Sequence, residues 1–269
     1  MKLNDREKRA IFRLAQHKNS NVKNAIAIVS GKGGVGKSLV TSLIASEMNK
    51  LGYKIAILDA DITGPSIPKA FGLKEKIQMR EGVGMVPAET KNGIKIVSTN
   101  LLIDKRTSAV VWRSPILTAA IRQFWQDIAW GDVDYMFIDL PPGTSDPQLT
   151  IFQSIPLMGI IVVTSPQELV SEIVEKALDM AQKLTIPVIG LVENFSYFIA
   201  PDTGNKYEIF GKSSVKKILE NKDIKLLAQI PIDPKISELV DKGNIEDLKE
   251  QYMNNLINNI LEIEKNEKQ

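Results

Sequence analysis

The chain has 269 residues, of which 43% are hydrophobic and 25% are charged, and its formal net charge is +2. This composition is ordinary for a folded globular protein, so it excludes the disordered and fibrous classes and favours no particular partner. The sequence contains no cysteine, which excludes disulfides, thiolate nucleophiles and thiolate metal sites. His17 is the one histidine, so a zinc or non-haem iron site would have to use carboxylates almost alone.

The N-terminal segment, residues 1–24, is strongly basic. It carries seven Lys or Arg residues against Asp5 and Glu7. We expect a basic helical arm whose charges face solvent, and the alternative is an arm that binds nucleic acid or a membrane. The first residues are too charged for a signal sequence, and the longest apolar stretch, residues 155–163, contains Pro156 and is too short to span a bilayer. We therefore expect a cytoplasmic protein without membrane contacts, and nucleic acid is not the expected partner.

Beyond the arm, short β-branched runs alternate with helical patterns. This alternation predicts an α/β fold, with a mostly parallel sheet of about seven or eight strands and helices on both faces, in one domain over residues 25–269. Strands are predicted at Ala25–Ser30, Lys54–Leu58, Ile94–Ser98, Tyr135–Asp139, Ile160–Thr164, Val188–Val192 and Lys225–Gln229. Helices are predicted at Lys37–Leu51, Pro115–Ala129, Glu168–Leu184, Gly211–Glu220 and Ile245–Glu264. The last helix has an apolar stripe formed by Leu248, Tyr252, Leu256 and Ile260.

A phosphate-binding loop follows the first predicted strand. Gly31 to Ser38 match the pattern G-x-x-x-x-G-K-[ST], with a strand expected before the loop and a helix after it. The glycines let successive N–H groups point at phosphate oxygens, and the helix N-terminus adds a partial positive charge. We expect Lys37 to bridge the β- and γ-phosphates of a nucleotide and the Ser38 hydroxyl to bind Mg²⁺. The residues expected to contact the nucleotide are Gly31, Lys32, Gly33, Gly34, Val35, Gly36, Lys37, Ser38 and Leu39.

The loop contains a second lysine, Lys32, whose early position directs its side chain away from the β–γ bridge of its own nucleotide. Such a cation is useful if it reaches across a two-fold axis to the nucleotide of a second subunit, as an arginine finger does. The alternative is a solvated loop residue. The segment GKGGVGKS resembles the deviant phosphate loop of the MinD/ParA/nitrogenase-iron-protein class of dimeric ATPases, and this resemblance implies the cross-subunit role.

Two predicted strands end in carboxylates. In AILDADITGPSIP, Asp59 and Asp61 lie where open α/β sheets bind ligands. We assign Asp61 to the attacking water and Asp59 to a magnesium-bound water, and the alternative is that both cap the following turn. In YMFIDLPPGTSD, Asp139 is expected to complete the magnesium site. The rigid turn at residues 141–144 offers N–H groups to a γ-phosphate, so its position can report whether ATP or ADP is bound.

The nucleotide base is expected to lie at two further strand ends. Asn194 follows a predicted strand, and its carboxamide can both donate to and accept from an adenine edge. Pro231 and Ile232 could flank the ring, with Asp233 beside them. The guanine-reading pattern N-K-x-D is absent from the sequence.

Several segments together resemble the Mrp/ApbC family of iron–sulfur cluster carrier ATPases. They are GKGGVGKS, DADITGPSIP, VVWRSPILTAAIRQF, WGDVDYMFIDLPPGTSD and ENFSYF…EIFG, within about residues 22 to 243. The resemblance implies a homodimeric ATPase that holds a labile cluster at the dimer interface and passes it to apo-proteins. The family has a C-x-x-C pair after the EN-x-S-Y-F segment. The matching positions here are Ala200 and Thr203, and neither side chain binds iron as a thiolate does.

The expected function is therefore a slow, Mg²⁺-dependent ATPase that switches a homodimer and acts on a metalloprotein or assembly-factor client, without cysteine ligands for a cluster of its own. The alternative is a MinD/ParA-like positioning ATPase that acts on membrane or DNA, although the C-terminal EIEKNEKQ does not favour an anionic surface. A small-molecule kinase is disfavoured because no acceptor-substrate constellation is apparent.

Overall fold

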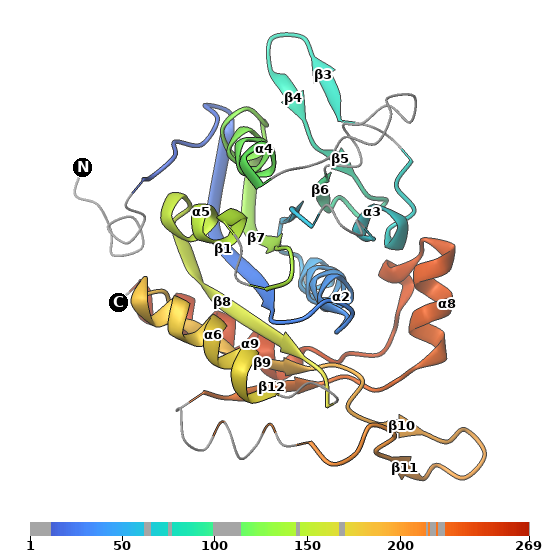
Figure 1. The fold of residues 1–269 in the computed structure, drawn as a ribbon. Helices are drawn as coiled ribbons and strands as arrows, with labels where there is room; N and C mark the ends of the chain where they lie inside the picture. Colours follow the sequence, from blue (N-terminus) through green and yellow to red (C-terminus); the bar gives the residue numbers. More distant parts are fainter. Residues whose placement is uncertain are drawn as a thin grey trace.

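The structure is a computed structural model, and it describes residues 12–61, 66–74, 77–98, 114–143, 146–166, 170–213, 215, 219 and 224–268. The main sheet consists of β1 (Ser20–Ser30), β2 (Ile55–Asp59), β5 (Ala88–Glu89), β6 (Lys95–Ser98), β7 (Gly131–Asp139), β8 (Leu157–Thr164), β9 (Val188–Glu193) and β12 (Leu226–Gln229). These eight strands have the order β12-β9-β8-β1-β7-β2-β6-β5 (Figure 1). All pairs are parallel except β5 with β6 at the edge, which confirms the predicted α/β fold.

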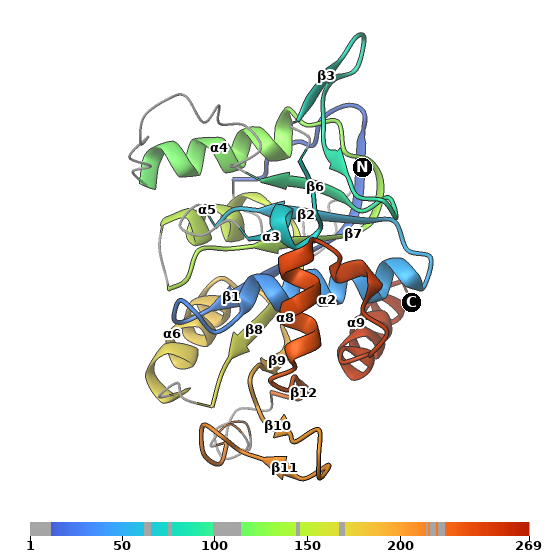
Figure 2. The ribbon, with the colours of Figure 1, turned by 90° about the vertical axis from the view of Figure 1, so that its right-hand side faces the viewer.

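Helices cover both faces of the sheet. They are α2 (Lys37–Lys50), α3 (Ile67–Ala70), α4 (Ser114–Gln126), α5 (Asp146–Ser154), α6 (Val170–Lys183), α8 (Pro234–Lys242) and α9 (Asn254–Glu267). Side chains of α2, α3, α8 and α9 pack in one buried cluster, and those of α4, α5 and α6 pack in the other. Figure 2 shows α3 and α8 on the side that faces the viewer.

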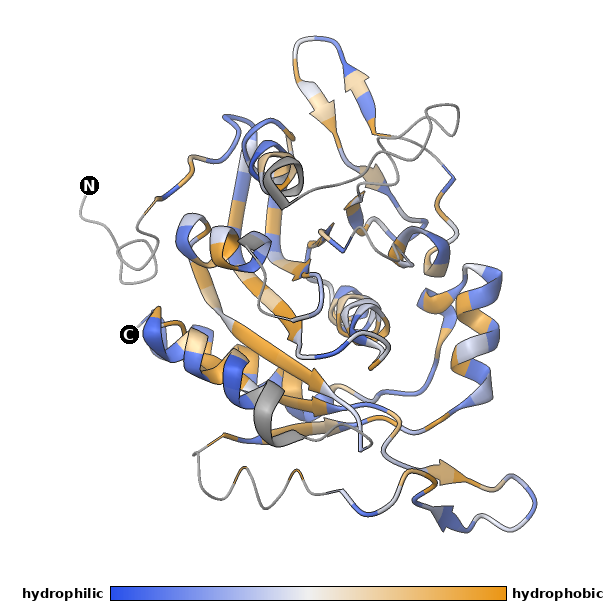
Figure 3. Ribbon diagram, in the orientation of Figure 1, coloured by the Kyte–Doolittle hydropathy of each residue, from blue (hydrophilic) through white to orange (hydrophobic). Residues whose placement is uncertain are grey.

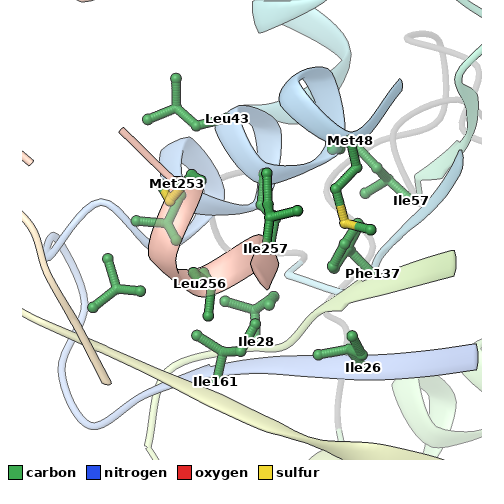
Figure 4. Packing of buried hydrophobic residues seen from close by; sticks show 14 of the residues in the cluster. Ile26, Ile28, Leu43, Met48, Ile57, Phe137, Ile161, Met253, Leu256 and Ile257 are labelled. Atoms are coloured by element: carbon green, nitrogen blue, oxygen red, sulfur yellow. The ribbon is translucent and has the colours of Figure 1, made fainter. Parts of the chain in front are cut away.

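The central strand β1 supplies both clusters. Ile26 and Ile28 belong to the cluster under α2 and α9, whereas Ala27 and Val29 belong to the opposite one. Because successive side chains of a strand point to opposite faces, a strand covered on both sides is apolar throughout (Figure 3). Figure 4 shows Leu256 of α9 close to Ile28 in this core.

The C-terminal region differs from the prediction of one helix over Ile245–Glu264. A 3₁₀ turn, η2 (Ile245–Asp247), is followed by irregular backbone, and α9 begins only at Asn254. The Glu47 carboxylate of α2 accepts hydrogen bonds from the N–H groups of Tyr252 (2.9 Å) and Met253 (3.1 Å). These two N–H groups therefore bond to a distant side chain and not to a carbonyl of a preceding helical turn. The predicted stripe is therefore wrong as a helix face, because two of its four members precede α9.

Two antiparallel hairpins extend from the sheet. One joins β3 (Gln78–Arg80) to β4 (Gly84–Val86), and the other joins β10 (Phe198–Ile199) to β11 (Lys206–Tyr207). The second hairpin projects at the end of the sheet that carries β9 and β12 (Figure 1). It contains the segment where the family resemblance places the cysteine pair.

The N-terminal arm also differs from the predicted helix in its described part. Residues 12–19 form turns and irregular backbone, and Ser20 to Asn24 belong to β1. Residues 1–11 lie outside the described residues, as do 214, 216–218 and 220, half of the predicted helix Gly211–Glu220. Among the described helices, none combines the length and the hydropathy that a bilayer crossing requires.

Candidate nucleotide-binding site

The phosphate-binding loop lies between the end of β1 and the start of α2. Gly34 has φ 84° and Gly36 has φ 81°, and glycine adopts this left-handed conformation without steric cost. Because α2 begins at Lys37, the free N–H groups of its first turn face the loop and favour an anion there. A cavity of 330 Å³ opens beside the loop, which is within the range of ligand pockets. It is lined by Ser30, Lys32, Gly33, Gly34, Gly36, Lys37, Ser38, Leu39, Asp61, Ser66 and Pro142.

A larger hollow of 680 Å³ lies at the opposite ends of the strands, where β6 and β7 begin. Lys95 lies there, and its Nζ already donates to the backbone carbonyls of Trp130 (2.6 Å) and Asp132 (3.3 Å). The carboxyl ends of parallel strands are where open α/β sheets bind ligands. The cavity at the phosphate-binding loop is therefore the candidate site.

Lys37 is buried between two of the predicted carboxylates. Its Nζ lies 2.8 Å from Asp139 Oδ1 and 3.3 Å from Asp61 Oδ2, and its side chain is 5% exposed. Asp61 follows β2 and Asp139 ends β7, and these two strands are neighbours in the sheet. The two carboxylates therefore neutralise the lysine that is expected to bridge the phosphates.

Asp139 also organises the start of α2. Its Oδ2 accepts a hydrogen bond from Ser38 Oγ (2.6 Å), and its Oδ1 accepts one from Thr41 Oγ1 (2.9 Å). Thr41 was not among the residues predicted from the sequence. Its position four residues after Lys37 could have indicated this role, since residues i and i+4 lie on the same face of a helix.

The Asp59 carboxylate accepts hydrogen bonds from its own chain segment and from the neighbouring strand β6. Its Oδ2 accepts from Ser98 Oγ (2.9 Å), and its Oδ1 accepts from the N–H of Asp61 (3.2 Å). Burial, reinforced by the negative charge of Asp139, raises the pKa of Asp59 to about 8. Asp59 is therefore protonated over most of the neutral range in this arrangement.

The expected magnesium ligands fit the ion chemically. Ser38, Asp59 and Asp139 offer only oxygen donors, and hard divalent cations such as Mg²⁺ prefer oxygen. Ser38 Oγ and Asp139 Oδ2 are in direct contact at the start of α2, so the two oxygens lie close enough together to bind one ion. Within the described residues, no cluster of three carboxylate or imidazole ligands occurs.

Lys32 lies at the exposed edge of the loop, and its backbone is tied to the turn that follows β7. Ser30 Oγ donates to the carbonyl of Lys32 (3.1 Å), and the N–H of Gly143 donates to the carbonyl of Ser30 (2.9 Å). Pro142 packs beside Gly33. The phosphate loop and the Pro-Pro-Gly turn are therefore in direct contact, as a turn that senses a γ-phosphate requires.

The residues expected to read the base lie outside the cavity lining. Asn194 is buried behind the loop, and its Nδ2 donates to the carbonyl of Val35 (3.0 Å). Asp233 caps α8 by accepting from the N–H of Lys235 (2.9 Å), and it also accepts from the hydroxyl of Tyr252 (2.9 Å). Pro231 and Ile232 precede this cap. Their role toward a base stays a prediction.

Ala200 and Thr203 lie at the tip of the β10–β11 hairpin. The N–H of Ala200 donates to the carbonyl of Asn205 (3.0 Å), and the carbonyl of Ala200 accepts from Gly204 (2.8 Å). Two residues that are three apart in such a tight turn lie on the same end of the hairpin. Neither side chain offers a soft ligand to iron.

The family model for the NUBPL iron-transfer P-loop NTPase matches residues 21–264. An iron–sulfur cluster carrier protein of Clostridium perfringens is 43% identical over 234 residues, which cover 84% of this chain and 82% of that protein. A second such carrier, from Methanocaldococcus jannaschii, is 45% identical over 225 residues, covering 83% of this chain and 78% of that protein.

A solved nucleotide-binding protein from Archaeoglobus fulgidus, in complex with ADP, is 40% identical and has a TM-score of 0.76, covering 86% of this chain and 90% of that one. The fold is shared with a chain of the MinC:MinD cell division complex of Aquifex aeolicus. The two chains are 20% identical with a TM-score of 0.63, and the match covers 90% of this chain and 96% of that one. The resemblance to iron–sulfur cluster carriers is thereby confirmed, and the chain belongs to the NUBPL iron-transfer P-loop NTPase family.

Proposed function

We propose that the protein is an ATP-binding and ATP-hydrolysing homodimeric switch of the iron–sulfur cluster carrier type, which works without cysteine ligands in this chain. The observation that carries the proposal is the buried contact of Lys37 with Asp61 and Asp139 beside a phosphate-binding loop. A buried lysine that two carboxylates hold in place is positioned for a polyanion, because a phosphate can replace the carboxylates as its partner.

ATP would enter the cavity with its phosphates against the N–H groups of residues 31–37. Lys37 would then leave the two carboxylates and bridge the β- and γ-phosphates, while Ser38 and Asp139 would hold Mg²⁺. The ion would neutralise charge that develops on the phosphates during transfer. Asp61, released from Lys37, would orient the attacking water by accepting one of its hydrogen bonds.

Lys32 would supply the missing cation from the other subunit. Its exposed position at the edge of the loop leaves it accessible to a second copy of the chain. A cation delivered across a two-fold axis couples hydrolysis to dimerisation, because neither subunit completes its site alone.

Cluster chemistry is the part of the family's function that this chain would perform indirectly. Ala200 and Thr203 occupy the positions of the family's cysteine pair, and the 269 residues contain no cysteine elsewhere. We infer that the protein contributes an ATP-dependent protein contact to the maturation of a metalloprotein or to an assembly factor, whose own ligands would hold the cluster.

The test is phosphate release from Mg–ATP with no added acceptor. The wild-type chain should release phosphate slowly, and Lys37→Ala should release none above background. Lys91→Ala is the matched control, since it removes an exposed lysine that pairs with Asp247 (2.7 Å) far from the loop. Phosphate release by Lys37→Ala at the wild-type rate would contradict the proposal.

A further inference from the structure

The segment Glu193–Phe195 touches the phosphate-binding loop with two consecutive side chains. Asn194 donates to the carbonyl of Val35 (3.0 Å) and lies so close that a Cβ on Gly36 would be 2.0 Å from its Nδ2. Phe195 has φ 57°, which is uncommon for an aromatic residue, and its ring lies 3.5 Å from the same Cβ position. A backbone conformation of this cost persists only where the surrounding contacts hold it.

The preceding residue, Glu193, holds both legs of the β10–β11 hairpin, which we define as residues 196–213. Ser196 precedes β10 and donates to Glu193 Oε2 (2.7 Å), whereas Ser213 follows β11 and donates to Oε1. Gln229 on the neighbouring strand β12 donates to Oε2 (2.9 Å). The carboxylate is fully buried, and a buried carboxylate is costly unless hydrogen bonds satisfy it. Movement of either leg therefore disturbs Glu193.

We propose that Glu193 is a positioning residue that couples the hairpin to the phosphate-binding loop. This inference rests on the proposed function, because it requires a nucleotide in that loop. A nucleotide that orders Val35 and Gly36 fixes Asn194 and Phe195 against them. Because Glu193 directly precedes Asn194, its backbone is then held in place as well. Its hydrogen bonds to Ser196 and Ser213 in turn restrict the motion of both hairpin legs.

The coupling acts in both directions. When two sites are coupled, each changes the other's affinity by the same factor, typically about 5-fold to 150-fold. The hairpin carries exposed apolar side chains, among them Ile199 and Tyr207, each 51% exposed. A protein that contacts these side chains would therefore change nucleotide affinity, and nucleotide exchange would change how firmly the hairpin is presented.

Hydrogen–deuterium exchange of the full chain, with and without saturating Mg–ADP, tests the coupling. ADP is the probe because it fills the loop without hydrolysis, and light scattering of the same samples establishes that the oligomeric state is unchanged. Two variants weaken the link without touching the loop: Ser213→Ala removes one donor, and Glu193→Gln keeps the shape of the side chain. Tyr135→Phe is the control, since it removes a hydroxyl that donates to a different carboxylate, Glu264.

In the wild type and in Tyr135→Phe, ADP should slow exchange in the phosphate-binding loop and in the hairpin. In Ser213→Ala and Glu193→Gln, the loop should stay protected while the hairpin loses its protection, and the Kd for ADP should rise about 5-fold. Protection of the loop alone in the wild type, or full hairpin protection in both variants, would overturn the coupling but leave nucleotide binding intact. Absence of protection in both segments of the wild type would contradict the proposed function, and the coupling with it.

Discussion

Asp59 and Asp139 stand opposite each other on the neighbouring strands β2 and β7, and Asp139 makes the shorter of the two ion pairs of Lys37. Burial of Asp59, reinforced by the negative charge of Asp139, raises the pKa of Asp59, so this carboxyl group holds its proton. Asp139 can therefore bind Lys37 and the first turn of α2 while Asp59 remains neutral.

Asp59→Asn should therefore flatten the dependence of stability on pH. The folded chain keeps a proton on Asp59 between the ordinary carboxyl pKa of 3.8 and about pH 8, whereas the unfolded chain has released it. Because the folded state binds the extra proton, the free energy of unfolding falls as pH rises through this window, by at most about 1.4 kcal/mol per pH unit. The Asn variant can still accept the N–H of Asp61 with its oxygen, its Nδ2 would donate to Ser98 Oγ instead of accepting from it, and it lacks this slope. Urea unfolding of the apo-protein across the window measures it, and equal slopes in both proteins would refute the assignment.

Lys37→Ala should abolish ATP binding and also weaken the fold. The change leaves Asp139 and Asp61 without the buried cation between them, and breaking a buried ion pair on one side costs about 3–5 kcal/mol. Titration calorimetry with Mg–ATP and thermal unfolding measure the two effects. A variant as stable as the wild type would mean that water already screens this pair.

Lys32→Ala should bind ATP with nearly unchanged affinity and lose turnover. Its side chain is exposed and does not touch the carboxylates that hold Lys37, so the fold should be unaffected. If Lys32 acts as a finger from the partner subunit, hydrolysis should fall by about 1000-fold, the lower end for such cations. Normal turnover in this variant would remove the reason to assign Lys32 across the interface.

Asp61→Ala should trap the ATP-bound state. The loop contacts to the phosphates remain, whereas the attacking water loses the group that orients it, so turnover should fall by about 100-fold or more. Nucleotide retained after gel filtration, analysed as ATP or ADP, measures the trapping. Recovery of ADP at the wild-type rate would place the water-orienting group elsewhere.

Ala200→Cys combined with Thr203→Cys tests what the hairpin has retained. The wild-type chain should stay colourless after reconstitution with iron and sulfide, since it offers no thiolate. The double variant should take up a cluster if the hairpin tips of two subunits meet at a two-fold axis. A stable cluster at one per wild-type dimer would contradict the loss of carrier chemistry.

Local patterns were sufficient to predict most of the sheet and the phosphate-binding loop. The apolar run of β8 and the Gly-Lys-Ser start of α2 are encoded within a few residues each. The Asp-Pro that starts α8 is an equally local signal, a capping residue followed by proline at the first turn, and it ends the segment expected to flank the base.

The remaining features depend on distant contacts. The break before α9 is set by Glu47, which lies 205 residues from Tyr252 in the sequence. The burial of Lys37 between two carboxylates requires β7 to lie between β1 and β2, an order that sequence periodicity does not specify. The clamp of Glu193 on both hairpin legs was missed for the same reason.

The most direct test of the account is the molar mass of the chain in solution, measured by light scattering with Mg–ATP, with Mg–ADP and without nucleotide. The Asp61→Ala variant serves as the slowly hydrolysing form, and Asp61→Ala combined with Lys32→Ala serves as its control. We predict a mass about twice the 29.8 kDa of one chain for the Asp61→Ala variant with ATP, and a return toward one chain when Lys32 is also removed. A mass that stays the same in all three nucleotide states, at ATP concentrations shown to saturate the site, would contradict the ATP-switched dimer.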